Sequence, residues 1–154
     1  MANTNNPHGF NVYRVRSGEG IIPLQHGLAA STFVATRGDP LTMLTTGLLD
    51  IATSSSTTIH GVCNAKYVSG TAQQNVEFIP ASDDVEFEGQ ASGDAQQTVI
   101  GQSMDISGTT GAVAINQSAA TTGVVRAIAF HPSDSVGNYA RLIVKFAKSS
   151  WEAN

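Results

Sequence analysis

Short apolar or alternating runs recur along the chain from Ile21 onward, about ten residues apart, and turn-forming residues separate them. This spacing is typical of β-sandwiches and β-barrels, in which short strands alternate with tight turns. Arg37-Gly-Asp-Pro40 predicts a turn, Thr46-Gly47 a hairpin tip, and the hydroxyl run at 53–56 a loop. We therefore predict strands over 32–37, 41–45, 48–52, 58–63, 65–69, 75–80, 84–90, 98–101, 112–116, 123–130 and 139–147.

The last predicted strand, 139–147, has the strongest core pattern. It contains three consecutive apolar residues, which indicates packing on both faces, and Arg141 and Lys145 share one side of it. A weak helical pattern lies around 114–120, but glycines and β-branched residues near it argue against a helix of any length. We therefore expect an all-β fold, with a barrel-like or sandwich body over 21–154.

The N-terminal residues 1–20 follow a different pattern. They are rich in Asn, Gly and Arg, and no helical period can be drawn through their isolated apolar residues. We predict an extended N-terminal arm that needs a partner surface, because ordering a free segment costs about 1–2 kcal/mol per residue. The arm residues expected to contact a neighbouring subunit are Phe10, Val12, Tyr13, Arg14 and Arg16.

Charge and composition exclude several classes of partner. Charged residues make up 13% of the chain, so its polar surface must consist largely of hydroxyl and amide groups. The net charge is −4, and the eight Lys and Arg residues are scattered, so nucleic acid is not an expected partner. No apolar run approaches the roughly 18 residues of a membrane helix, and the N-terminus lacks a signal-peptide pattern. We expect synthesis in the cytoplasm without export, and no membrane partner.

Acidic residues cluster at 83–88. In a strand, Asp84, Glu86 and Glu88 would project from one face and the apolar residues between them from the other. Three such carboxylates could bind a divalent cation such as calcium, or two of them could act as the acid and base of glycoside cleavage. We prefer a solvated strand face or a subunit contact, because the Gly-spaced loop of acidic ligands typical of calcium sites is missing.

The other chemistry-bearing residues form no recognised motif. The four histidines are never within five residues of one another, so no metal-binding pair exists in the sequence. Cys63 is the only cysteine and lies in an apolar run, which predicts a buried, inert thiol without a disulfide. Nucleophile-elbow and phosphate-loop motifs are missing, and Arg37-Gly-Asp39, an adhesion tripeptide, precedes a proline that favours a plain turn. We expect no catalytic residue, no cofactor and no metal, and hence no enzyme.

Short motifs over most of the chain carry a resemblance. The chain opens Asn6-Pro-His-Gly-Phe10, followed by Tyr13-Arg14 and a Gly-rich step at 18–20. Further motifs are Arg37-Gly-Asp-Pro40, Gly61-Val62, Val85-Glu-Phe-Glu88, Ile100-Gly101, Ser107-Gly108 to Gly111, and Val136-Gly137 before a terminal Arg-Leu-Ile-Val strand. In these motifs the sequence resembles the small bacteriophage capsid decoration (cement) proteins, whose N-termini commonly read A-N-x-x-x-P-x-G-F. Leu41 stands where that family has Val.

The resemblance implies a small β-barrel or β-tulip-like body that forms a homotrimer near local threefold axes of the expanded capsid. Such a protein is structural: it binds the outside of the capsid and stabilises it by bridging major capsid protein subunits. The expected location is the virion surface, after synthesis in the host bacterial cytoplasm, and the expected partners are the major capsid protein and further copies of the chain. The alternatives are a carbohydrate-binding or host-adhesion head module, a tail-tube or head-fibre protein, and a small hydrolase that uses the acidic strand.

Overall fold

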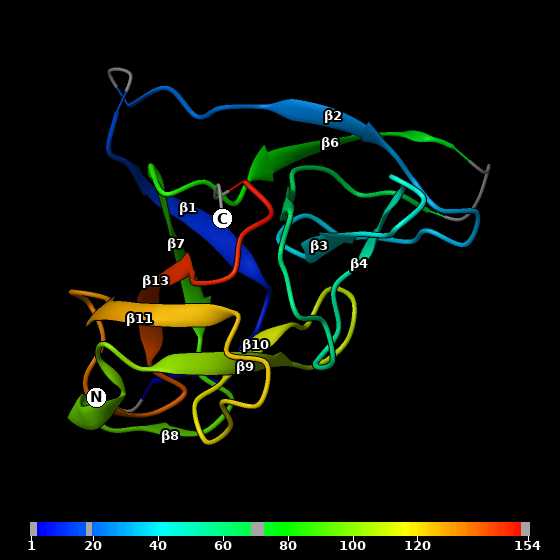
Figure 1. The fold of residues 1–154 in the computed structure, drawn as a ribbon. Helices are drawn as coiled ribbons and strands as arrows, with labels where there is room; N and C mark the ends of the chain where they lie inside the picture. The colour runs from blue at the N-terminus through cyan, green and yellow to red at the C-terminus, as the bar shows by residue number, and fades with distance from the viewer. Residues whose placement is uncertain (1–2, 18–19, 69–72, 152–154) are drawn as a thin grey trace.

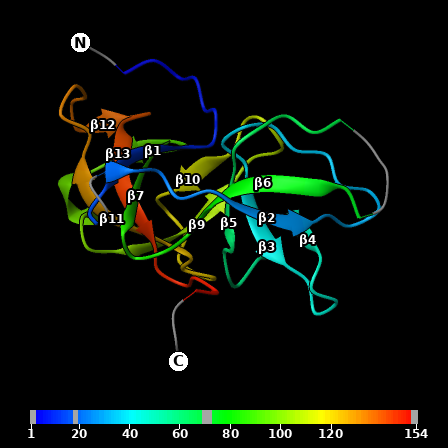
Figure 2. The same ribbon diagram turned by 90° about the horizontal axis from the view of Figure 1, so that it is seen from above.

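The computed structural model describes residues 3–17, 20–68 and 73–151, and it confirms the all-β fold class. A six-stranded and a five-stranded sheet lie side by side (Figures 1 and 2). A pair of short strands, β8 (Asp94–Ala95) and β12 (Gly137–Asn138), extends from the first of them. The described part of the chain has no α-helix. It does contain a short 3-10 turn, η2 (Gln97–Val99).

The six-stranded sheet is antiparallel throughout and has the order β1-β7-β13-β11-β9-β10. It curls so far that Ala91, directly after β7, forms a parallel bridge with Ile115 in β10. A single bridge is not a ladder, so the described residues do not close a full barrel. The strands are β1 (Phe10–Val15), β7 (Val85–Gln90), β9 (Ser103–Ser107), β10 (Ala114–Asn116), β11 (Val125–Phe130) and β13 (Arg141–Phe146).

The five-stranded sheet is also antiparallel and has the order β2-β6-β5-β3-β4. Its edge strand β2 pairs with β6 although the two are far apart in the sequence, and both lie at the top of Figure 1. The strands are β2 (Gln25–Leu28), β3 (Pro40–Met43), β4 (Leu49–Ile51), β5 (Gly61–Cys63) and β6 (Asn75–Pro80).

Two clusters of buried apolar side chains stabilise the sheets. The larger one fills the curled six-stranded sheet, where the ring of Phe146 lies 5.1 Å from those of both Phe10 and Phe87, measured between centroids. It also includes Val62 and Ile79 of the five-stranded sheet, so the two sheets share a core. The smaller cluster consists of Ala29, Phe33, Ala35, Leu41, Leu49, Cys63, Val76 and Phe78.

Most predicted strands are present. β3 to β7, β10, β11 and β13 each overlap a predicted range, because their alternating or fully apolar runs match the burial that they experience. The predicted strand 98–101 falls largely on the η2 turn instead, and 114–120 forms β10 and a turn rather than a helix. The predicted strands 32–37 and 65–69 meet at one bridge, between Ala35 and Tyr67, and residue 69 lies outside the described residues.

The predicted N-terminal arm is corrected by the structure. Residues 1–2 and 18–19 lie outside the described residues, but 10–15 form β1, which pairs antiparallel with β7 from Phe10↔Gly89 to Val15↔Val85. Phe10 is 1% exposed and belongs to the main core. The boundary near residue 20 is therefore wrong. A register shift between Val12 and Arg14 disturbs the alternation that normally reveals a strand in a sequence.

The segment after β13 joins the two sheets. Ser149 forms a parallel bridge with Ile59, which precedes β5. Beyond it, the indole of Trp151 lies 4.8 Å from the imidazole of His60, measured between ring centroids, and its Nε1–H donates to the His60 carbonyl. The chain up to Trp151 therefore continues from the six-stranded sheet to the start of β5, the central strand of the five-stranded sheet.

Candidate functional site

The five predicted contact residues do not form one exposed surface. Phe10 is in the core, Val12 packs against it, and Tyr13 is 37% exposed with its ring edge-on to His131. Their burial reflects the place of β1 in the sheet. The remaining two, Arg14 and Arg16, bind a carboxylate of their own chain.

That carboxylate is Glu86, whose side chain is only 1% exposed. Arg14 donates from Nε and Nη2 to Glu86 Oε2, at 3.0 and 2.7 Å. Arg16 Nε lies 2.6 Å from Oε1, in an ion pair whose angle does not make a hydrogen bond. The two guanidinium groups contact both carboxylate oxygens of Glu86, and these contacts hold β1 against β7. The prediction of a solvated strand face or a subunit contact is therefore wrong for Glu86, which is buried and paired within its own chain.

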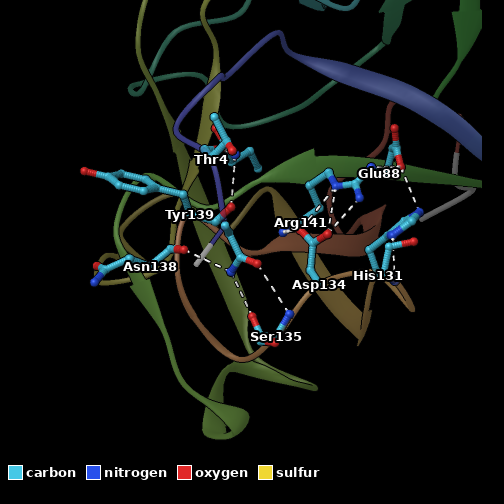
Figure 3. A network of polar contacts seen from close by, with 11 residues as sticks. Thr4, Glu88, His131, Asp134, Ser135, Asn138, Tyr139 and Arg141 are labelled. Atoms are coloured by element: carbon cyan, nitrogen blue, oxygen red, sulfur yellow. Dashed lines mark hydrogen bonds and ion pairs between the residues drawn. The ribbon is translucent and has the colours of Figure 1, made fainter. Parts of the chain in front are cut away.

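A second polar network lies at the other end of the acidic strand (Figure 3). Arg141 donates from Nε and Nη2 to the carboxylate of Asp134, with a shortest distance of 2.7 Å, and its Nη1 lies 3.7 Å from Glu88 Oε2. The same Glu88 oxygen is 3.3 Å from His131 Nε2. His131 Nδ1 in turn accepts a hydrogen bond from the backbone N–H of Ser133.

Charge pairing between Asp134 and Arg141 shifts the pKa values of these two residues. Burial acts to raise the pKa of Asp134, but the hydrogen bonds and positive charge of Arg141 outweigh it and hold that pKa below its ordinary value. The hydrogen bond to Asp134 raises the pKa of Arg141 in the same way. Asp134 and Arg141 therefore stay ionised as a pair at neutral pH, which makes Asp134 a poor proton donor.

A pocket of about 390 Å³ opens beside this pair. Its lining residues all carry polar groups, namely amides, hydroxyls, an imidazole and the Asp134–Arg141 pair, although carbon atoms of these side chains also face the pocket. The lining residues come from the N-terminal segment, the end of β7 and the loop between β11 and β13. They are Asn3, Thr4, Asn6, His8, Gln90, Ser133, Asp134, Ser135 and Arg141.

Gln90 positions the N-terminal wall of the pocket. This side chain is buried, and its Nε2 donates to the carbonyls of Thr4 and Tyr139, at 2.6 and 3.0 Å, while its Oε1 accepts from the N–H of Asn6 at 2.8 Å. On the far side, Asn3 Nδ2 donates to the carbonyls of Ser135 and Asn138, two residues that are labelled in Figure 3. Hydrogen bonds therefore hold the N-terminal segment on both sides, from Asn3 to the loop before β13 and from Thr4 and Asn6 to Gln90.

Sequence reasoning missed this pocket. Asn6 and His8 appeared only within a motif of the resemblance, and Ser133 and Ser135 appeared in no motif at all. Lining residues separated by more than a hundred positions carry no local pattern, because tertiary structure alone brings them together. The polar character of both segments is the single signal that the sequence offers.

Two other sequence candidates are buried. Asp39 of the Arg-Gly-Asp tripeptide is 0% exposed and accepts hydrogen bonds from the N–H groups of Thr36 and Gly111, so it cannot be presented to a receptor. Burial raises the pKa of Asp39, although these two hydrogen bonds act in the opposite direction. Cys63 is 1% exposed, and burial raises the pKa of its thiol to about 11, as expected of an inert core cysteine.

Exposed apolar side chains concentrate before and on the edge strand β2. Ile21 is 71% exposed, and Ile22, Leu24 and Leu28 are each nearly half exposed. We call these four residues the β2 apolar edge. The stretch 20–36 around them contains no Asp, Glu, Lys or Arg. Burying this edge against a partner would therefore desolvate no Asp, Glu, Lys or Arg of this stretch, although Glu77 of β6 lies 3.6 Å from His26.

Comparisons with known proteins do not place the chain in a family: no family model matches it, and no curated protein matches it. Within the described ranges, no helix is long and apolar enough to cross a membrane. The same residues contain no group of three or more His, Cys, Asp or Glu side chains that could hold a metal ion.

Proposed function

We propose that the chain is a structural protein that binds the outside of a bacteriophage capsid and stabilises it by bridging major capsid protein subunits. The observation that carries the proposal is the β2 apolar edge, which combines an edge strand with four exposed apolar side chains in a charge-free stretch. Edge strands expose unpaired backbone groups, and exposed apolar clusters mark protein interaction surfaces. The resemblance of the sequence motifs to capsid decoration proteins supplies the kind of partner.

The attachment surface in this proposal is the β2 apolar edge in place of the predicted arm. Phe10 and Val12 are engaged in the core of their own chain, and Arg14 and Arg16 pair with Glu86. Tyr13 keeps enough exposure to lie at the margin of a contact. We further propose a homotrimer, in which three weak contacts act together and raise the avidity by about 10² to 10⁴.

A co-sedimentation titration with expanded capsids of the phage that encodes the chain tests this proposal. Ile21→Ser combined with Leu24→Ser should weaken capsid binding at least tenfold, because both apolar side chains lose their burial in the complex. Val136→Ser is the matched control, since Val136 is 46% exposed but lies in the loop before β12. Equal binding by the double variant and the control would contradict the attachment surface. Failure of the unaltered protein to sediment with capsids would contradict the function itself.

Multi-angle light scattering of the purified protein tests the trimer. The expected mass is three times the 16.0 kDa of the chain. A monomer at micromolar concentration would contradict the trimer in solution. Electron microscopy of native particles separates this function from a tail-tube or head-fibre role, because density on the tail or in a fibre would favour those alternatives over the capsid surface.

A further inference from the structure

The polar pocket contains many hydrogen-bonding groups that the described residues leave without a partner. The hydroxyls of Thr4, Ser133 and Ser135 and the side-chain amide of Asn6 make no hydrogen bond within the described residues, although all four residues line the pocket. His8 uses Nδ1 in a hydrogen bond with the carbonyl of Asn6 and keeps Nε2 for a further partner. Hydroxyls and amides both donate and accept, so this lining can match a ligand that also does both.

The charge of the lining excludes two classes of ligand. Its one cation, Arg141, and its one anion, Asp134, are bonded to each other, and Glu88 lies 3.7 Å from the same guanidinium. An anionic ligand would meet a guanidinium that two carboxylates already neutralise, and a cation would meet that guanidinium directly. The pocket therefore favours a ligand without net charge.

The residue types of the lining disfavour a third class. Apolar ligands bind in pockets lined mainly by aliphatic and aromatic side chains, and this lining has none apart from the imidazole of His8. The volume of about 390 Å³ lies near the lower end of the range of small-molecule pockets. A small neutral ligand with hydroxyl groups on several sides fits these limits.

We propose that this pocket binds a neutral saccharide residue, through the hydroxyls of Ser133 and Ser135, the amide of Asn6 and Nε2 of His8. This binding site is independent of the β2 apolar edge, which lies on the other sheet. No aromatic ring in the lining offers a flat stacking surface of the size of Trp or Tyr, so a single site binds weakly. The Arg141–Asp134 pair holds the loop that presents Ser133 and Ser135.

An NMR titration of the uniformly ¹⁵N-labelled full chain tests the site. The probes are the methyl glycosides of glucose, galactose and N-acetylglucosamine, and the corresponding free sugars. At least one probe should cause saturable shifts confined to the backbone amides of the lining residues. Tighter binding of a methyl glycoside than of its free sugar identifies the end of a glycan as the source, and the reverse identifies the soluble sugar.

Ser133→Ala combined with Ser135→Ala should weaken that binding roughly tenfold, since each lost hydrogen bond contributes about 0.5–1.5 kcal/mol. Ser31→Ala combined with Ser54→Ala is the matched control, because both serines are exposed and neither lines the pocket. The control variant should bind as the unaltered protein does. The proposal is overturned if no sugar gives saturable shifts, if the Ser133/Ser135 variant binds undiminished, or if inorganic phosphate saturates the same amides more tightly than any sugar.

Discussion

Arg14 donates two hydrogen bonds to one carboxylate oxygen of Glu86, its cross-strand neighbour between β1 and β7. The carboxylate is almost completely buried, whereas the Arg14 side chain is 55% exposed. A buried carboxylate is stable only when cations and donors compensate for its lost hydration, and Arg16 supplies the second cation. The first strand of the chain is therefore held in the sheet by charge as well as by the burial of Phe10.

Glu86→Gln should lower the free energy of unfolding by about 1.5–3 kcal/mol, because a neutral amide cannot replace the charged hydrogen bonds with Arg14 and the ion pair with Arg16. Urea denaturation at neutral pH measures the change. Asp83→Asn is the control: Asp83 is 74% exposed and lies 3.7 Å from Lys145, so its loss should change stability by less than about 1 kcal/mol. Equal effects of the two substitutions would show that the Glu86 pair does not stabilise the fold.

Phe10→Ala should destabilise the protein by about 3–5 kcal/mol, because it removes a ring at the centre of the main core. Tyr13→Ala, in the same strand, should cost about 1 kcal/mol or less, since its ring is 37% exposed and rests on His131. Thermal unfolding followed by circular dichroism compares them. If the Phe10→Ala variant were as stable as the Tyr13→Ala variant, the result would favour the predicted extended arm over a β1 strand in the core.

Stability should fall as the pH drops below about 6.5, and His60 should be one cause. Burial lowers the pKa of His60 in the folded protein, so the unfolded chain binds a proton more readily. The stabilisation by neutral His60 is complete above the unfolded pKa and is lost as the pH falls through the folded one. Unfolding followed by Trp151 fluorescence, which reports on the ring beside His60, should show this loss. His60→Asn should flatten the profile between pH 7 and 5, and an unchanged profile would contradict the assignment.

Asp105→Asn should destabilise the protein near neutral pH by about 1–3 kcal/mol. The Asp105 carboxylate accepts hydrogen bonds from the N–H groups of Thr121, Thr122 and Gly123 and from the Thr122 hydroxyl. Burial acts to raise the pKa of Asp105, but these bonds outweigh it, and the pKa lies below its ordinary value. The contribution is therefore present above the unfolded pKa, near 4, and is lost as the pH falls through the folded value. The stabilities of variant and unaltered protein, measured by urea denaturation, should converge in acid; a constant difference down to pH 2 would contradict this.

Local pattern predicted the strands whose burial follows a regular period. The run Leu142 to Val144 is buried on both faces in β13, as its three consecutive apolar residues indicate. β1 was missed because its register shift breaks the alternation of buried and exposed residues. β2 was missed because Gln25-His-Gly-Leu28 is mostly exposed, so its sequence has no alternating apolar face. β2 is defined by its pairing with β6, which lies about fifty residues later and therefore outside any short stretch of sequence around β2.

Glu86 and Glu88 lie on β7 as predicted, whereas Asp84 lies in the turn before that strand, and the partners of these residues could not be predicted. Arg14 and Arg16 lie some seventy residues before Glu86, and the sequence assigned them to a partner protein rather than to their own chain. The polar pocket shows the same limit more strongly, because Asn6 and Ser133 meet only after the strands of the six-stranded sheet have come together. A site that is formed by residues far apart in the sequence can be identified only from the tertiary structure.

The pairing of β1 with β7 has a consequence for folding during translation. β1 is made before β7, its strand partner among the described residues, whose Gly89 lies opposite Phe10. At roughly 5–20 residues per second, a ribosome takes several seconds to extend the chain from one strand to the other. During that interval Phe10 has no core to enter, and β13, the other neighbour of β7, is still unmade. The six-stranded sheet can therefore assemble only after β13 has been made, and until then β1 is exposed to chaperones and to premature association.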